Sequence, residues 1–227
     1  DGEIEILVTC RDITDQRKAE ATAADYVKRL ESSVLGTAAA VSQMVELRDP
    51  YTAGHEWRVG ELAAAIGEEL GLDAYRLKGL RVAGAVHDVG KIRVPAEILS
   101  RPGKLSQAEY DLVKEHAEQG YLVLQPIDFP WPIAETVRQH HERLDGSGYP
   151  RGLEGDTILL EARIIAVADV VESMASHRPY RPAHAMDVAL AELRSGAGRL
   201  YDTRVVDACF LLFEEKGYVL PQPSYAG

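Results

Sequence analysis

Cysteine is nearly absent from this sequence, which contains two in 227 residues. Cys10 and Cys209 are too few and too far apart to build a disulfide framework, which predicts a reducing compartment and therefore a cytoplasmic protein. Long apolar runs are also missing, because no stretch approaches the roughly 20 residues that span a bilayer. The start, DGEIEILV, is not a signal peptide and lacks Met, so we expect a fragment of a longer protein without a membrane span.

Basic charge is scarce as well. The chain carries 25 Lys and Arg against 36 Asp and Glu, a formal net charge of −11. No basic stripe is present to release counterions from nucleic-acid phosphates, so we do not expect polynucleotide binding. A small anionic substrate stays possible where a metal or a few arginines reverse the local field. The length predicts one large domain, or one domain with a small appendage.

The first fifty residues predict a strand followed by a long helix. Apolar residues alternate over 4–10, as in a strand, and residues 16–47 contain no Pro and a single Gly. Apolar side chains then fall at heptad positions. Such a helix could pack on its own domain or form the seam of a parallel dimer, and we favour the seam for residues 20–35. The heptad series is Val27, Leu30, Val34, Val41 and Met44.

From Thr52 onward the periodicity is helical throughout. Ser106 and Glu109 are spaced as a capping box that opens one of these helices. An all-α domain of seven or more helices follows. The expected helices cover 56–70, 74–89, 106–124, a segment ending at His141, 159–175, 184–195 and 203–216.

Histidine is the unusual feature of these helices. Five of the seven histidines continue apolar stripes and so point inward, as do two aspartates. One inward histidine or aspartate is ordinarily satisfied by a hydrogen bond or an Arg. Seven on one interior, as neutral imidazoles and ionised carboxylates, favour divalent metal, and their number suits two neighbouring six-coordinate ions. The residues are His55, His87, Asp88, His116, His140, His141 and Asp169.

The order of these residues resembles that of HD-type metal-dependent phosphohydrolases, in which H, HD and D follow one another. The segments HHERLDGSGYP, HDVGKIRVP, ILSRPGKL and ADVVESMASHRPYRP narrow the resemblance to the HD-GYP domain, over about residues 41–213. It implies hydrolysis of cyclic di-GMP to linear pGpG, and in some members on to GMP. The strand followed by RDITDQRKAE resembles the end of a PAS sensor domain. We therefore expect a PAS-like remnant over 1–15, a helical linker over 16–40 and the HD-GYP domain over 41–227.

The HD-GYP resemblance assigns roles residue by residue. One metal would take His55, His87, Asp88 and Asp169, and the other His116, His140 and His141, with Asp88 bridging the two. Lys91 would bind the scissile phosphate and share the catalytic role with Asp88. A solvated surface is the alternative for such cations, and we favour function for Lys91 because it follows Asp88 by three residues. The remaining substrate-binding candidates are Arg178 and Arg181, which would bind phosphates or guanines, and Gly148, Tyr149 and Pro150 at the pocket rim. In that turn, Gly146 and Gly148 permit backbone angles that other residues resist.

One position departs from the family. Some members place a Glu four residues before the first ligand His, where it helps to hold a third metal, but this chain has Tyr51. A phenol is a poor ligand at neutral pH, so we expect two metals, with Fe or Mn favoured over Mg, Ni, Co or Zn. The implied reaction is attack on phosphorus by a hydroxide that bridges the metals. No general acid for the leaving group is evident, and His177 and His184 are expected at the surface.

Three other interpretations come from different classes. A different HD-type enzyme would share the early ligands but not the segment 140–150. A catalytically weak domain could bind cyclic di-GMP without cleaving it, although such proteins usually lose ligands and none is lost here. A metal or redox sensor is the third. The expected partners are cyclic di-GMP, a second copy through the N-terminal helix, an upstream sensor domain and a GGDEF-type diguanylate cyclase at the GYP turn.

Overall fold

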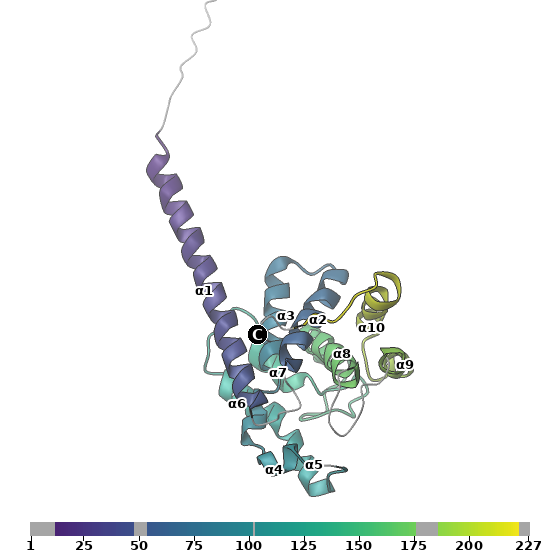
Figure 1. The fold of residues 1–227 in the computed structure, drawn as a ribbon. Helices are drawn as coiled ribbons and strands as arrows, with labels where there is room; N and C mark the ends of the chain where they lie inside the picture. The colour runs from purple at the N-terminus through teal and green to yellow at the C-terminus, as the bar shows by residue number, and fades with distance from the viewer. Residues whose placement is uncertain (1–11, 48–53, 102, 176–185, 223–227) are drawn as a thin grey trace, which may run out of the picture. The chain divides into compact units, whose positions relative to one another are not determined.

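Every regular element that the computed structural model describes is helical, which confirms the all-α expectation (Figure 1). The structure describes residues 12–47, 54–101, 103–175 and 186–222. The expected strand over 4–10 lies outside them. The helices are α1 (Thr14–Glu46), α2 (His55–Glu69), α3 (Ala74–Val86), α4 (Ala96–Leu99), α5 (Gln107–Lys114), α6 (His116–Leu124), α7 (Ile133–Gln139), α8 (Leu160–Ala175), α9 (Met186–Gly196) and α10 (Thr203–Phe210), with short helices η1 (Val89–Arg93), η2 (Gly155–Thr157) and η3 (Leu211–Glu215).

The chain divides into two compact units, Asp1–Gly36 and Thr37–Gly227, and α1 runs through the boundary. The described part of the first unit is helical, and its heptad side chains Val27 and Leu30 are 55% and 66% exposed. A single chain therefore leaves these two side chains uncovered, whereas Val41, later in the series, packs against the core of the second unit. The dimer seam stays a prediction.

Helices α2, α3 and α8 form the centre of the second unit, and α9 and α10 pack against α8 (Figure 1). Their apolar stripes supply the core, with Leu62, Leu80 and Ile165 fully buried. Helices α2 and α3 come into close contact at two glycines, because a β-carbon on Gly84 would lie only 2.4 Å from the Cα of Gly60. This close crossing allows the C-terminus of α3 to lie beside the start of α2.

The helix expected over 106–124 is two helices. The capping box at its start is confirmed, since Ser106 and Glu109 exchange both hydrogen bonds. The chain then leaves α5 after Lys114 and begins α6 at His116. The carbonyl of Val113, near the end of α5, accepts a hydrogen bond from the His116 imidazole. A side chain thus satisfies one of the carbonyls that the ending helix leaves open.

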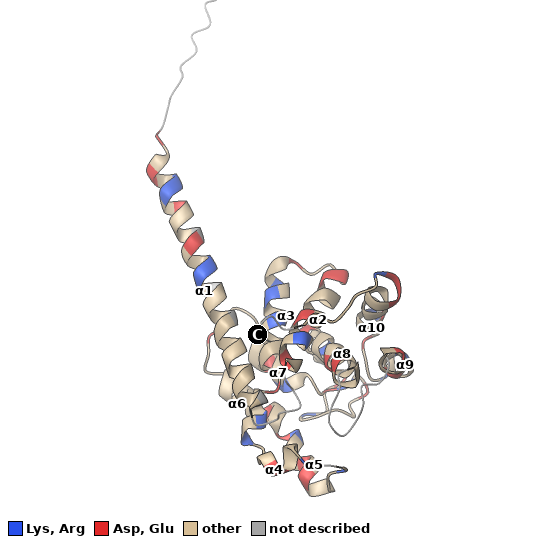
Figure 2. Cartoon of the chain, viewed as in Figure 1, with Lys and Arg blue, Asp and Glu red and all other residues tan. Residues whose placement is uncertain are grey.

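Charged residues of both signs lie along the described helices. In the view of Figure 2, Lys and Arg are interspersed with Asp and Glu. None of the described helices has the length and apolar character of a membrane span.

Candidate metal centre

The candidate ligands converge from the ends of helices that are far apart in the sequence. His55 begins α2 and His116 begins α6, while His87 and His140 immediately follow α3 and α7. Asp169 comes from the middle of α8. Each of these four histidines is at most 3% exposed. The second unit therefore gathers imidazoles in its interior, as the helical periodicity predicted.

Three of the imidazoles are oriented by the same hydrogen bond. The Nδ1–H groups of His87, His116 and His140 each donate to the backbone carbonyl three residues earlier, at 2.8, 2.6 and 2.5 Å. Because a carbonyl can only accept, Nδ1 carries the proton and Nε2 is left with its lone pair. These helix-ending hydrogen bonds fix both the tautomer and the direction of the rings.

His55 is oriented by a carboxylate instead. Its Nδ1–H donates to Glu172 of α8, and the other oxygen of Glu172 accepts a hydrogen bond of 2.6 Å from Nε of Arg58. The Nε2 of His55 then lies 3.3 Å from Oδ1 of Asp169. Carboxylates that bond the far nitrogen of a histidine ligand in this way are typical partners at metal sites.

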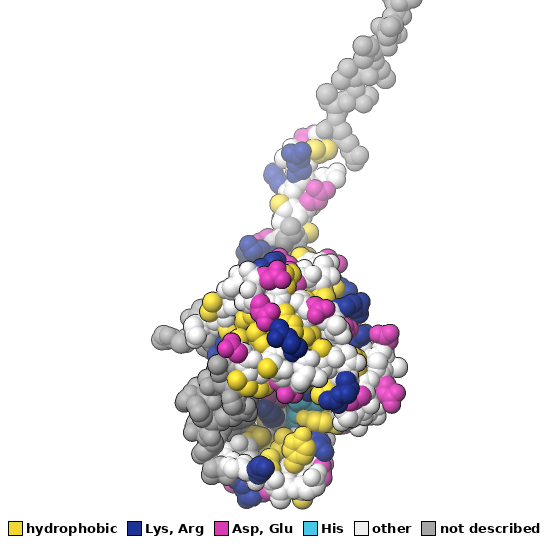
Figure 3. Space-filling model, turned by 90° about the vertical axis from the view of Figure 1, so that its right-hand side faces the viewer, with side chains coloured by type: hydrophobic (Ala, Val, Ile, Leu, Met, Phe, Trp, Pro, Cys, Tyr) yellow, Lys and Arg dark blue, Asp and Glu magenta, His cyan; other side chains and the backbone are white. Residues whose placement is uncertain are grey.

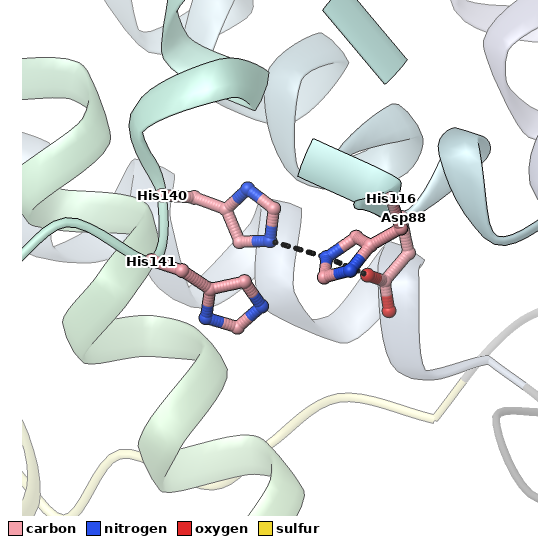
Figure 4. A group of neighbouring side chains, drawn as sticks. All are labelled: Asp88, His116, His140 and His141. Atoms are coloured by element: carbon pink, nitrogen blue, oxygen red, sulfur yellow. Dashed lines mark hydrogen bonds and ion pairs between the residues drawn. The ribbon is translucent and has the colours of Figure 1, made fainter. Parts of the chain in front are cut away.

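The ligand atoms fall into two groups that share Asp88. In each group they all lie within 4.8 Å of one another. His116 lies 3.3 Å from Oδ1 of Asp88, whereas His87 lies 3.5 Å from its Oδ2, so the two carboxylate oxygens face different groups. The groups are Asp88, His116, His140 and His141, which Figure 4 shows pointing toward one another, and His55, His87 and Asp88.

The residues present suit divalent cations. The Nε2 atoms of His116 and His140 face each other at 3.3 Å (Figure 4), although both rings already carry their proton on Nδ1. The buried Nε2 of His87 forms no hydrogen bond with any residue in the described part of the chain. Facing lone pairs repel each other and a buried one without a partner is costly, and a cation removes both penalties. The cluster could therefore bind metal.

Proton affinities in the cluster favour the same conclusion. Burial, together with His87 and His116, lowers the pKa of His140 to about 3, and burial also lowers the pKa values of His116 and His141. Burial raises the pKa of Asp88, but Lys91 and the neighbouring histidines together outweigh burial and hold that pKa well below its ordinary value. His116, His140 and His141 are thus neutral and Asp88 is ionised at neutral pH, which are the forms that bind metal.

His55 behaves differently from the other histidines. Burial lowers its pKa, yet hydrogen bonds with Asp169 and Glu172 more than compensate and raise the pKa to about 10. Its Nε2 therefore carries a proton at neutral pH without a metal. Metal binding at this atom must release that proton.

The cluster opens into a pocket of about 260 Å³, and histidine surface is visible within a hollow on this face of the molecule (Figure 3). Lys91 lines the pocket, with its Nζ 2.5 Å from Oδ2 of Asp88. Tyr149 and Ser173 line it as well. One small anionic molecule in the pocket could therefore reach both the ammonium group of Lys91 and the candidate metal ligands.

The turn after the histidine pair agrees with the sequence at one glycine and differs at the other. Gly146 has a φ of 75°, as expected. Gly148 is not among the residues with positive φ, so that expectation was wrong for it. Glycine is needed at position 148 because no side chain fits there: a β-carbon would lie 2.5 Å from the backbone oxygen of His141. Pro150 follows in an exposed position.

The structure brings together all seven candidate ligands, Lys91 and Tyr149. The expectations for Tyr51, His177, Arg178, Arg181 and His184 lie outside the described residues. Sequence reasoning missed Glu172 and Glu142, both buried carboxylates beside the candidate ligands. A signal for Glu172 was present, since it follows Asp169 by three residues on a mainly apolar helix and so shares its face.

Comparison with known proteins decides the family. The profile described as "HD domain" matches residues 39–205, which is most of the chain. The chain belongs to the HD domain family. This membership accounts for the H, HD and D order on which the centre is built.

Two relatives of the HD domain illustrate the range of named activities. The cyclic di-GMP phosphodiesterase response regulator RpfG of Xanthomonas campestris is 42% identical over 76% of this chain and 46% of its own length. The 3′3′-cGAMP-specific phosphodiesterase 1 of Vibrio cholerae is 39% identical over 77% of this chain and 41% of its own. The chain thus spans less than half the length of these two curated relatives.

A solved structure supports the fold of the HD domain. The cyclic GMP-AMP-specific phosphodiesterase V-cGAP3 of Vibrio cholerae superposes with a TM-score of 0.62 at 17% sequence identity. The match covers 80% of this chain and 49% of that one. At this identity the likeness concerns the helical architecture alone.

Proposed function

We propose that this HD domain is of the HD-GYP type and is a metal-dependent phosphodiesterase that hydrolyses cyclic di-GMP to linear pGpG, with a slow second step to GMP because Tyr51 stands where some members have the Glu that helps to hold a third metal. The observation that carries the proposal is the pair of ligand groups joined by Asp88 at the bottom of a pocket that Lys91 also lines. Paired metal sites that share a ligand suit in-line displacement at phosphorus. The name of the relative from Xanthomonas campestris supports cyclic di-GMP as the substrate.

Two divalent ions, Fe or Mn before Mg, Ni, Co or Zn, would supply a water acidic enough to ionise near neutral pH and charge to stabilise the phosphoryl oxygens. His55, His87 and Asp169 would hold one ion and His116, His140 and His141 the other, with Asp88 in both sets. Lys91 would bind a non-bridging oxygen of the scissile phosphate and stabilise the charge that develops there. Gly148, Tyr149 and Pro150 would form the rim against which the nucleotide binds.

A second substrate is favoured by a specific observation. A relative almost as similar as the first is named for 3′3′-cGAMP, which differs from cyclic di-GMP in one base. The ligand groups and Lys91 would act on the phosphate of either dinucleotide, so base recognition must lie elsewhere in the pocket. A domain that binds the dinucleotide without cleaving it, or that senses redox state through its metals, is the alternative of a different class.

The proposal is tested by incubating the Mn²⁺-loaded chain with cyclic di-GMP or 3′3′-cGAMP and identifying the products chromatographically. From cyclic di-GMP, linear pGpG should form first and GMP later. The chain should consume cyclic di-GMP faster than 3′3′-cGAMP. Tight binding with no linear product would favour the sensing alternative. If the chain neither binds nor cleaves either dinucleotide, the proposal is refuted.

We further propose that the chain is a cytoplasmic output module. In this arrangement residues 1–15 end a PAS-like sensor, residues 16–40 form a dimeric linker and residues 41–227 form the catalytic domain. The exposed side of the GYP turn, including Ser147 and Arg151, is the surface proposed for a GGDEF-type diguanylate cyclase.

The dimeric linker makes a prediction of its own. Leu30→Asp should convert a dimer of the full chain into a monomer, because a buried seam would have to accept a charge at the position that is now 66% exposed. Light scattering gives the mass directly. Lys28→Asp, also exposed but outside the heptad series, is the control and should stay dimeric. A wild-type chain that is monomeric at every concentration tested would remove the seam.

A further inference from the structure

His141 differs from the other four clustered histidines in what orients its ring. The rings of His55, His87, His116 and His140 each donate a hydrogen bond from Nδ1. Among the described residues, nothing accepts or donates a hydrogen bond at the ring of His141. An imidazole without such a bond is free to rotate unless packing holds it.

An aromatic ring takes the place of that hydrogen bond. Tyr149 stacks on His141 with ring centroids 4.7 Å apart and an interplanar angle of 30°. The ring of His140 also contacts His141, at 4.0 Å between centroids. Near-parallel offset rings at this spacing attract each other beyond the area they bury. The imidazole of His141 is therefore held by stacking.

The rest of the turn holds Tyr149 in place. The backbone N–H of Tyr149 donates to the carbonyl of His141 at 3.2 Å, so the chain returns onto the histidine that it left eight residues earlier. The close approach of Gly148 to the same carbonyl excludes any larger residue. Further along, the buried carboxylate of Glu142 accepts hydrogen bonds from the backbone N–H groups of Arg151 and Leu153 at 2.8 and 2.9 Å.

We propose that Tyr149 is a positioning residue, whose ring fixes the imidazole of His141 for binding the metal that His116 and His140 share. This rests on the proposed metal function and adds a task to the GYP turn, which the sequence placed only at the pocket rim. The phenol hydroxyl has no part in the task. Phe should therefore replace Tyr149 for metal binding, and an aliphatic residue should not.

The test is a calorimetric titration of chelator-treated full-length chain with Mn²⁺, for wild type, Tyr149→Phe and Tyr149→Leu. Wild type and Tyr149→Phe should bind two ions with the same affinities. In Tyr149→Leu one ion should bind ~10–100-fold more weakly, as when other groups that orient ligands are removed, while the other ion binds as before. This selective effect separates positioning from a general loss of structure, which would weaken both ions.

Tyr218→Leu is the matched control, since Tyr218 is also half-buried and packs edge-on against Phe213 away from the cluster. It should bind both ions as wild type does. If Tyr149→Leu binds both ions as tightly as wild type does, the inference is overturned and the proposed function is left intact. Weakening in Tyr149→Phe as large as in Tyr149→Leu would overturn it too. A wild-type chain that binds no Mn²⁺ would refute both proposals.

Discussion

Asp88→Asn should abolish the binding of both ions as a pair and reduce turnover of the cyclic dinucleotide by at least ~10³-fold, because charge stabilisation at the reacting phosphate is lost with the metals. Asp88 is the one described residue common to both ligand groups, and its two oxygens face different groups. Asn keeps its size, so the fold is retained. Calorimetry with Mn²⁺ and product analysis measure the two effects.

Lys91→Ala gives the contrasting result. The metal ligands remain, so two ions should still bind, whereas turnover should fall by ~10²–10³-fold as one charge on the phosphoryl oxygens disappears. Asp207→Ala, on the exposed side of α10, serves as the control and should change neither property. Full turnover in Asp88→Asn, or loss of both ions in Lys91→Ala, would contradict the assigned roles.

Glu172→Ala should destabilise the metal-free protein by about 3–5 kcal/mol, because it breaks a buried ion pair from one side. The Glu172 side chain is 1% exposed and that of its partner Arg58 15% exposed. The same variant removes the acceptor that orients His55. Affinity for one of the two ions should therefore fall by ~10–100-fold. Urea unfolding in the presence of chelator measures the first effect and Mn²⁺ titration the second.

The control for Glu172 lies on the same helix. Glu161 of α8 pairs with Arg76 at 2.7 Å, but these side chains are 17% and 39% exposed. Glu161→Ala should cost at most ~1 kcal/mol, as is usual for ion pairs open to solvent. If Glu172→Ala unfolds at the same urea concentration as Glu161→Ala, the buried pair contributes less than its burial indicates.

The sequence predicted the helices and the inward histidines because helical periodicity is a local property. His87 continues the stripe of Leu80 and Gly84, and such continuity is visible without a structure. The break between α5 and α6 was not predictable in this way. It depends on the His116 side chain bonding the Val113 carbonyl, which competes with a helix that the periodicity alone would continue.

The metal centre was predictable in its members but not in its geometry. Spacing along the chain could not show that His55 meets Glu172, since these residues are 117 positions apart and come together only through the packing of α2 on α8. The resemblance to HD-GYP domains supplied the grouping of the ligands around Asp88. The reason for Gly148 also needed coordinates, because close approach of two backbone segments leaves no trace in a local pattern.

Placement of the histidines at helix ends has a consequence for folding. Because α2, α3, α6, α7 and α8 each contribute or directly flank a candidate ligand, the two ions would together join five segments of the chain as a noncovalent crosslink. A ligand at 100 times its Kd stabilises the folded state by ~2.7 kcal/mol. That gain would act at the ends of these helices, so the metal-free protein should open there more readily and be cleaved faster by proteases.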